Sequence, residues 1–188
     1  MKTHNRISTR RLVIAALMAA LTVVGSSLRI KVPVDLVGTS AFHLGNIMCA
    51  LSGLLLGPWL GGLAAGLGSA IYDMFDPVYI SECWLTFLMK GAYGVAVGLV
   101  AYAGKKRWGY IKATLATSAG AVLYALLYLG KNYAKAVFIQ GIAYDAALIA
   151  VSAKLPATIF NAFVAIIFAP ILATAIREAL KRNHLSLE

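Results

Sequence analysis

The stretch FHLGNIMCALSGLLLGPWLGGLAAGLGSAIYDM, residues 42–74, decides the fold that we expect for this chain. Two apolar runs are separated by GPWLGG at residues 57–62, and glycine and proline are typical of a tight turn. We therefore expect two lipid-embedded helices that form a hairpin. Apart from two serines, the polar side chains of the stretch are His43 and Asn46 near its start and Tyr72 and Asp73 near its end. Crossing the membrane and returning brings both ends to one side, where we expect these side chains to help form a binding site.

The composition of the chain is that of a membrane protein. Of its 188 residues, 61% are hydrophobic and 13% are charged, whereas soluble domains carry roughly 25% charged residues. So much apolar surface needs lipid to cover it, and at ~20 residues for each spanning helix the length allows six or seven spans at most. The sequence contains no G-x-x-x-x-G-K-[ST] loop for nucleotide phosphates. We therefore do not expect the chain to hydrolyse ATP itself.

The hydropathy pattern predicts that residues 1–188 form a single transmembrane domain. We expect this domain to be an all-α bundle of six helices. The predicted spans are residues 12–28, 42–57, 61–74, 85–102, 113–130 and 156–180. Residues 29–40 are too polar to span and are expected to form a loop, either a lid or a connector. Residues 138–155 are expected to form a short helix at the interface. Cys49 and Cys83 differ in depth, so we expect neither a metal site nor a disulfide.

The distribution of basic residues predicts the orientation, since cytoplasmic loops carry an excess of Lys and Arg. Six spans place both termini on one side. That side holds eleven basic residues, including a retained N-terminal segment: Lys2, Arg6, Arg10, Arg11, Lys105, Lys106, Arg107, Lys112, Arg177, Lys181 and Arg182. The opposite side holds five: Arg29, Lys31, Lys131, Lys135 and Lys154. We therefore expect both termini to be cytoplasmic and the polar ends of the hairpin to face outward.

A lysine interrupts the fourth predicted span. Lys90 follows Trp84 by six residues, which places it about 9 Å further along the helix. An intramembrane charge usually faces a cavity or a partner, although a long lysine stem can also snorkel to the interface. Trp84 and Tyr93 flank Lys90 in sequence, and this favours a role in a cavity over snorkelling.

Further polar residues complete the predicted site. Glu82 precedes the fourth span and Tyr133 follows the fifth, so both would lie at the rim with Lys131 and Lys135. The predicted substrate-binding residues are His43, Asn46, Tyr72, Asp73, Glu82, Trp84, Lys90, Tyr93 and Tyr133. Asn161 lies within the sixth span, where we expect a hydrogen bond between helices.

The first span carries two pairs of alanines spaced four residues apart, Ala15 with Ala19 and Ala16 with Ala20. Small residues at this spacing share a helix face and allow another backbone to approach closely. By themselves they favour packing inside the bundle over docking on a second membrane protein.

Three runs together carry a resemblance to a known family. They are HLGNIMCALSGLLLGPWLGGLAAGLGSAIYDM at residues 43–74, LTFLMKGAYGVAVGLVA at 85–101 and KLPATIFNAFVAIIFAPIL at 154–172. The chain resembles the substrate-binding (S) components of energy-coupling factor (ECF) vitamin transporters, from Arg11 onward. The LLGPWLGG turn followed by GSAIYD, together with LPATIFNA, is the most specific part of the resemblance.

The resemblance implies a six-helix monomer in a prokaryotic plasma membrane that captures a vitamin from outside under loop lids. Such a component docks on a T subunit and two ATPases and topples in the membrane to release its cargo. The alanine pairs resemble the A-x-x-x-A face used for docking, so the resemblance assigns Ala15, Ala16, Ala19 and Ala20 to the T-subunit surface. It implies no enzymatic activity, no cofactor and no nucleic-acid partner.

The sequence gives the least specific information about which vitamin is bound. The chain resembles none of the dedicated riboflavin, thiamine or biotin subtypes, and is closer to a broad group that includes cobalamin transporters. Cobalamin is therefore the first expectation, followed by folate and pantothenate.

Two other classes remain as alternatives. An intramembrane enzyme would need a Ser–His pair or an H-E-x-x-H motif, and the sequence shows neither G-x-S-x-G nor H-E-x-x-H. A solitary channel or transporter would need internal repeats or charges through the membrane depth, and the inner halves of the predicted spans carry almost none.

Overall fold

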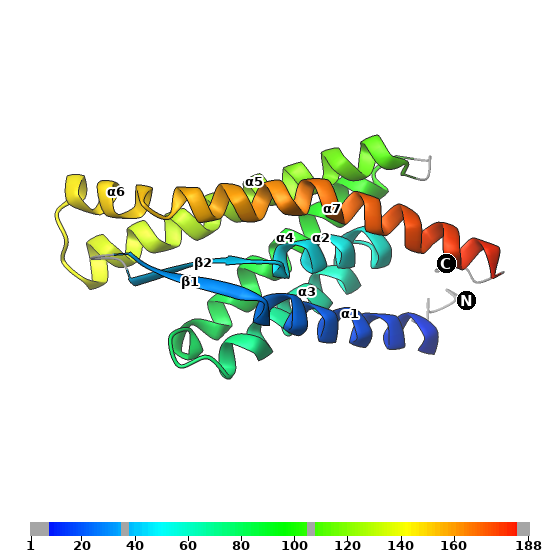
Figure 1. The fold of residues 1–188 in the computed structure, drawn as a ribbon, viewed down its shortest axis with the longest axis horizontal. Coiled ribbons are helices and arrows are strands. Elements are labelled where there is room, and N and C mark those ends of the chain that lie inside the picture. Colours follow the sequence, from blue (N-terminus) through cyan, green and yellow to red (C-terminus); the bar gives the residue numbers. More distant parts are fainter. Residues whose placement is uncertain (1–7, 35–37, 105–107, 184–188) are drawn as a thin grey trace, which may run out of the picture.

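The computed structural model describes residues 8–34, 38–104 and 108–183, which form a helical bundle with one two-stranded hairpin (Figure 1). The elements in order are α1 (Thr9–Ser27), β1 (Arg29–Val34), β2 (Gly38–His43), α2 (Gly45–Leu56), α3 (Pro58–Met74), η1 (Ile80–Glu82), α4 (Cys83–Tyr102), α5 (Tyr110–Ala134), η2 (Lys135–Ile139), α6 (Tyr144–Ser152) and α7 (Leu155–Arg182). The predominantly helical class agrees with the sequence-based expectation. The short helix expected within residues 138–155 corresponds to α6.

Within the described residues, four helical segments are long and apolar enough to cross a membrane. They are Thr9–Ser27, Ile80–Tyr102, Tyr110–Ile139 and Leu155–Arg182. Helix α2 has only 12 residues, or about 18 Å at 1.5 Å per residue, which is shorter than the ~30 Å hydrocarbon core. Six spans therefore remain a prediction, whereas a multi-helix membrane bundle is what the fold displays.

Residues 29–40 do not form the loop that we expected. Arg29 pairs with His43 and Val34 with Gly38, so β1 and β2 form an antiparallel ladder. Ile30, Val32 and Val34 are β-branched and favour a strand, and Pro33 is tolerated because each strand of a two-stranded hairpin has a free edge. The strand β2 runs to His43, and α2 consequently begins at Gly45 rather than at residue 42.

The first turn of α1 and the last turn of α7 lie at the same end of the bundle (Figure 1). The Arg11 guanidinium there donates to the Leu56 carbonyl at 2.9 Å, and the Arg177 guanidinium donates to the Trp108 carbonyl at 2.9 Å. That this end is cytoplasmic stays a prediction. Five of the basic residues behind that prediction lie outside the described residues: Lys2, Arg6, Lys105, Lys106 and Arg107.

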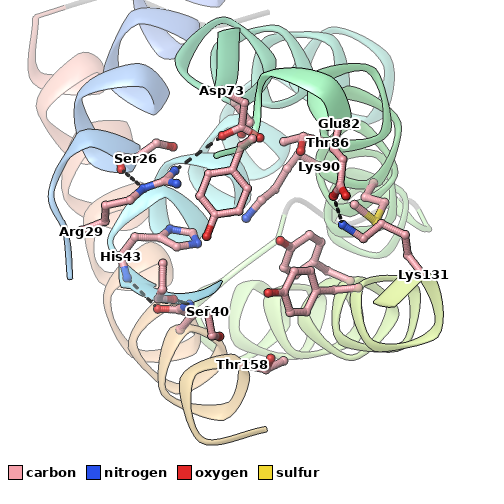
Figure 2. Close-up of a pocket in the computed structure, with 17 residues that line it drawn as sticks. Ser26, Arg29, Ser40, His43, Asp73, Glu82, Thr86, Lys90, Lys131 and Thr158 are labelled. Carbon is pink, nitrogen blue, oxygen red and sulfur yellow. Dashed lines mark hydrogen bonds and ion pairs between the residues drawn. The ribbon is translucent and has the colours of Figure 1, made fainter. Parts of the chain in front are cut away.

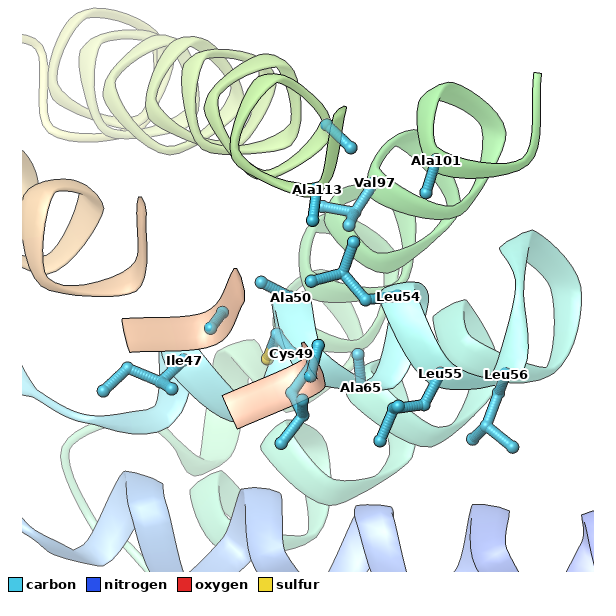
Figure 3. Close-up of a cluster of buried hydrophobic side chains, with 14 of the residues drawn as sticks. Ile47, Cys49, Ala50, Leu54, Leu55, Leu56, Ala65, Val97, Ala101 and Ala113 are labelled. Atoms are coloured by element: carbon cyan, nitrogen blue, oxygen red, sulfur yellow. The ribbon is translucent and has the colours of Figure 1, made fainter. Parts of the chain in front are cut away.

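Helix α2 is the centre of the bundle. Eleven of its 12 residues are buried, and α1, α3, α4 and α7 all pack against it. Figure 3 shows Ile47, Ala50 and Leu54 of this helix among side chains from α3, α4 and α5. A helix that is apolar on every face needs such enclosure, which explains why so short a helix is stable here.

Three helices meet backbone to backbone at glycines. A Cβ atom on Gly61 would lie 2.7 Å from the Gly53 Cα, and one on Gly94 would lie 2.9 Å from the Gly62 Cα. One on Gly53 would lie 2.5 Å from the Gly94 carbonyl oxygen. These distances leave no room for a methyl group, and the atoms that it would meet belong to the backbone and cannot rotate away. The glycines therefore fix how closely α2, α3 and α4 approach.

We predict that Gly61→Ala destabilises the protein. The added methyl group must push α3 away from α2, and overpacking of this kind costs about 1–3 kcal/mol. Gly130→Ala is the matched control, because nothing lies within 4 Å of a Cβ at Gly130. Thermal unfolding in detergent should show a lower melting temperature for Gly61→Ala only. Equal melting temperatures for Gly61→Ala and the wild type would contradict the close packing of these helices.

Candidate functional site

A cavity opens at the end of the bundle opposite to the first turn of α1. It is surrounded by the β1–β2 hairpin, α3, η1, α4, α5 and α7. Its empty volume, which includes the open mouth, is about 700 Å³. Figure 2 shows side chains from these elements converging on it. The lining residues are Ser26, Arg29, Ser40, Ala41, His43, Ser69, Asp73, Tyr79, Glu82, Thr86, Met89, Lys90, Tyr124, Tyr128, Lys131, Thr158 and Asn161.

Lys90 is the most deeply buried cation of this cavity, with 4% of its surface exposed. Its ammonium group donates to the Asn46 Oδ1 on α2 and lies 4.0 Å from the centre of the Tyr124 ring. A cation over an aromatic face is attracted by the ring quadrupole. Among the described residues, no carboxylate forms an ion pair with Lys90. The structure therefore places Lys90 inside the cavity, held by one amide oxygen and one ring.

Tyrosines form one wall of the cavity. Tyr124 and Tyr128 are four residues apart on α5, so they share a helix face, and their ring centres lie 6.0 Å apart at 24°. Tyr93 stacks behind Tyr124 at 5.8 Å and is fully buried. Gly120 leaves space for Tyr93, since a Cβ there would lie 2.7 Å from its ring. Tyr93 thus supports the wall rather than lining the cavity.

Arg29, the first residue of β1, connects the hairpin to α1 and α3. Its Nε donates to the Ser26 carbonyl at 2.9 Å, and its guanidinium lies 3.7 Å from both Asp73 and Asp76. The same group lies 4.1 Å from the centre of the Tyr72 ring. Arg29 was not among the predicted site residues, although it lines the cavity beside two that were.

Asp76 fastens β1 to the segment between α3 and η1. Its carboxylate accepts from the Lys31 ammonium at 2.8 Å and from the Val78 backbone N–H at 3.1 Å. Burial alone would raise the pKa of Asp76, but the bonds from Lys31 and Val78 and the charge of Arg29 outweigh burial and lower it. The carboxylate is therefore ionised in the folded protein at neutral pH.

Glu82 closes the side of the cavity nearest to α5. Its carboxylate pairs with Lys131 at 2.5 Å and also with Lys135. Lys131 comes from the last turns of α5 and Lys135 from the π-helical η2. Glu82, Lys131 and Lys135 thus join the start of α4 to the end of α5 at the mouth of the cavity.

The Asn161 side chain bonds to β2 rather than to a neighbouring helix. The prediction of a hydrogen bond between helices is therefore wrong. Its Oδ1 accepts from the His43 backbone N–H at 2.9 Å, and its Nδ2 donates to the Ala41 carbonyl at 2.8 Å. Lys154 adds a bond from its ammonium to the Thr39 carbonyl at 3.0 Å. The start of α7 thereby satisfies one edge of the hairpin.

His43, the last residue of β2, lines the cavity and also accepts a hydrogen bond from the first residue of α2. Its Nδ1 accepts from the Gly45 backbone N–H at 3.1 Å. A neutral imidazole whose Nδ1 accepts carries its proton on Nε2. His43 can therefore offer an N–H donor to a bound molecule.

Of the nine residues predicted to bind substrate, four line the cavity: His43, Asp73, Glu82 and Lys90. Asn46 lies beneath Lys90, Tyr72 lies under Arg29, and Tyr93 lies behind Tyr124. Trp84 is 59% exposed, and Tyr133 packs in a separate cluster around Ala136 and Ala147. Neither lies among the cavity residues.

The four alanines predicted for docking divide into two pairs. Ala15 is buried, and Ala19 faces α3, where a Cβ on Gly68 would meet its backbone. Ala16 and Ala20 are exposed on the outer face of α1. Only Ala16 and Ala20 are free to contact a partner.

Comparison with known proteins identifies the family of this chain. The family model for the ECF-type riboflavin transporter S component matches residues 6–178. The chain belongs to this family. As an ECF S component, it is a multi-pass protein of the cell membrane, which agrees with its four long apolar helices. The S component is also 33% identical, over 114 residues, to an uncharacterized protein of Pyrococcus woesei, a match covering 61% of this chain and 72% of that protein.

The Asp76 contacts predict a dependence of stability on pH. Because the folded-state pKa is lowered, Asp76 stabilises the fold above its ordinary pKa of about 3.9, and this contribution is lost as the pH falls through the lowered value. We expect Asp76→Asn to lower the melting temperature at pH 7 and to weaken its fall on acidification. Asp145→Asn, at an exposed carboxylate of α6, is the control and should behave like the wild type.

Melting curves between pH 7 and about pH 2 would measure this dependence. Identical acid profiles for the wild type and Asp76→Asn would show that Asp76 does not hold the hairpin.

Proposed function

We propose that this S component captures a small vitamin with a planar ring system in the cavity bounded by the hairpin and α5. The tyrosine wall is the observation that carries the proposal. Tyr124 and Tyr128 present stacked rings beside Lys90, and aromatic pairs contribute about 0.5–1.5 kcal/mol beyond their buried area. A planar heterocycle would extend this stack, while the polar residues around it would bind ring substituents.

The shape of the cavity favours a thin, planar vitamin of moderate size. Its 700 Å³ includes open space at the mouth, and only about 70 Å³ is enclosed, so a bulky ligand fits poorly. A flavin or the pterin of folate is thin and planar, whereas cobalamin, which the sequence favoured, is much larger. Pantothenate has no ring to stack. The family description names riboflavin, so a flavin is the first cargo that we propose and folate the second.

The opening of the cavity supports capture from outside. The cavity lies at the end of the bundle away from the first turn of α1, and the basic residues predict that the α1 end is cytoplasmic. A vitamin would then enter from the outer face, beneath the hairpin. Asn161 and Arg29 hold that hairpin over the cavity.

A thermal-shift panel of B vitamins tests the proposed cargo. A ligand at 1,000 times its Kd stabilises a protein by about 4 kcal/mol, so one vitamin should raise the melting temperature clearly. We expect a flavin or folate to do so, and cobalamin and pantothenate not to. A response to cobalamin alone would show that cobalamin, rather than a flavin or folate, is the cargo. No response to any vitamin would contradict vitamin capture.

We further propose that the outer face of α1 docks on a T subunit that works with two ATPases, as S components do. Ala16 and Ala20 lie on that face, and small side chains allow a helix of another protein to approach closely. Both alanines are exposed and do not pack within the bundle, so this face is available for docking.

Replacing these alanines tests the docking surface. Ala16→Trp and Ala20→Trp should abolish vitamin uptake in cells that also express the T subunit and ATPases, while the purified variants still bind the vitamin. Val122→Trp, at a position of α5 that is 60% exposed, is the control and should retain uptake. Loss of binding together with uptake would indicate that the face packs within the bundle.

A further inference from the structure

The outer end of the described bundle carries more positive than negative charge. Six cations line the cavity or lie close to residues that line it: Arg29, Lys31, Lys90, Lys131, Lys135 and Lys154. Three carboxylates pair with them, namely Asp73, Asp76 and Glu82. In the part of the chain that the structure describes, the remaining carboxylate of this end, Asp145, is exposed on α6. Among these residues the positive excess therefore lies around the cavity.

The ion pairs are unevenly shared among the six cations. Arg29 and Lys31 pair with the two aspartates, and Lys131 and Lys135 share Glu82. In the described part of the chain, no ion pair joins Lys90 or Lys154 to a carboxylate. Lys154 is 2% exposed, and burial first, then the charge of Lys131, lowers its pKa to about 8. Burial and the neighbouring charge of Lys131 thus both disfavour the charged form of Lys154.

Lys90 differs from Lys154 because it points into the cavity. Lys154 donates to the Thr39 carbonyl and so has a structural role. Lys90 lines the cavity between Asn46 and Tyr124, and neither partner carries a negative charge. A buried charge without a counter-ion is costly, and such a residue within a membrane protein commonly marks a ligand site.

We propose that the vitamin bound here carries an anionic group, a carboxylate or a phosphate ester, that pairs with Lys90 while its planar ring lies against the wall formed by Tyr124 and Tyr128. This inference rests on the proposed function. It assigns a charge to the cargo, which neither the fold nor the family description does. Neutral riboflavin would leave Lys90 without a counter-ion, whereas a flavin phosphate or folate would supply one.

The surroundings of Lys90 would strengthen such a pair. The Lys90 side chain is almost excluded from water, and an ion pair in a low-dielectric interior is stronger than one at a surface. Lys131 at the rim is more exposed, at 18% of its side chain, and is already paired with Glu82. The Nε2–H of His43 can donate a further bond to the anion or to a ring carbonyl. Lys90 is therefore the group that selects for charge.

Matched acidic and neutral ligands test this inference by calorimetric titration of the purified protein. Riboflavin 5′-phosphate against riboflavin tests the phosphate, and folate against its diamide tests the carboxylate. Since hydrogen bonds to charged groups are stronger than neutral ones, the acidic member of the pair that fits should bind at least about tenfold more tightly. Equal or tighter binding of the neutral member would overturn the inference and leave the proposed function intact. Binding of none of the four would instead contradict the proposed function.

Substitution of Lys90 shows whether this residue causes the preference for an anionic ligand. Lys90→Met should reduce the affinity for the acidic ligand to about that for its neutral counterpart, whereas Lys90→Arg should retain much of the preference. Lys181→Met is the control, because Lys181 lies at the other end of α7 with 60% of its side chain exposed. An equal loss of affinity for both ligands would show a structural role for Lys90 and overturn the assignment. If Lys90→Met does not fold, the preference of the wild type and of Lys90→Arg for the acidic over the neutral ligand still tests the inference.

Discussion

The structure depends on the glycine contacts at which α2, α3 and α4 meet without intervening side chains. Gly53, Gly61 and Gly94 bring these backbones so close that a methyl group cannot be accommodated. Lys90 lies four residues before Gly94, on the same face of α4, and Asn46 lies seven residues before Gly53, on the same face of α2. The contact that closes the helices together therefore also places the Lys90 ammonium against the Asn46 amide.

Placing a charge inside a membrane protein has a cost that the surroundings of Lys90 only partly offset. One amide oxygen and one ring face stabilise the ammonium, but neither neutralises it. The β1–β2 hairpin is held by ion pairs of Arg29 and by bonds of Asn161 to β2, so contacts within the protein fix the groups around the cavity. A site preformed in this way would lose little free energy in ordering itself on binding.

Local patterns predicted the parts of this fold that depend on local sequence. The helical hairpin of α2 and α3 and its polar ends near His43 and Asp73 follow from runs and turns within residues 42–74. The long apolar helices follow from apolar runs elsewhere in the chain. The strands were missed because Pro33 and Gly38 are typical of a loop, and because their pairing partners are set by the docking of β2 on Asn161, which is remote in sequence.

The predicted site was incomplete for similar reasons. Trp84 and Lys90 are six residues apart, about 120° around a helix, so only one of them can face the cavity. Tyr124 and Tyr128 come from α5, and their spacing of four on an apolar helix was the signal that could have identified them. Arg29 could not be assigned without the hairpin that carries it.

A structure of the protein with bound vitamin would show whether the cavity holds the substrate with an anionic group at Lys90. We predict a planar ring against Tyr124 and Tyr128, with the anionic group within about 3 Å of the Lys90 ammonium. A vitamin bound at the other end of the bundle, or in this cavity with only neutral atoms facing Lys90, would contradict this prediction.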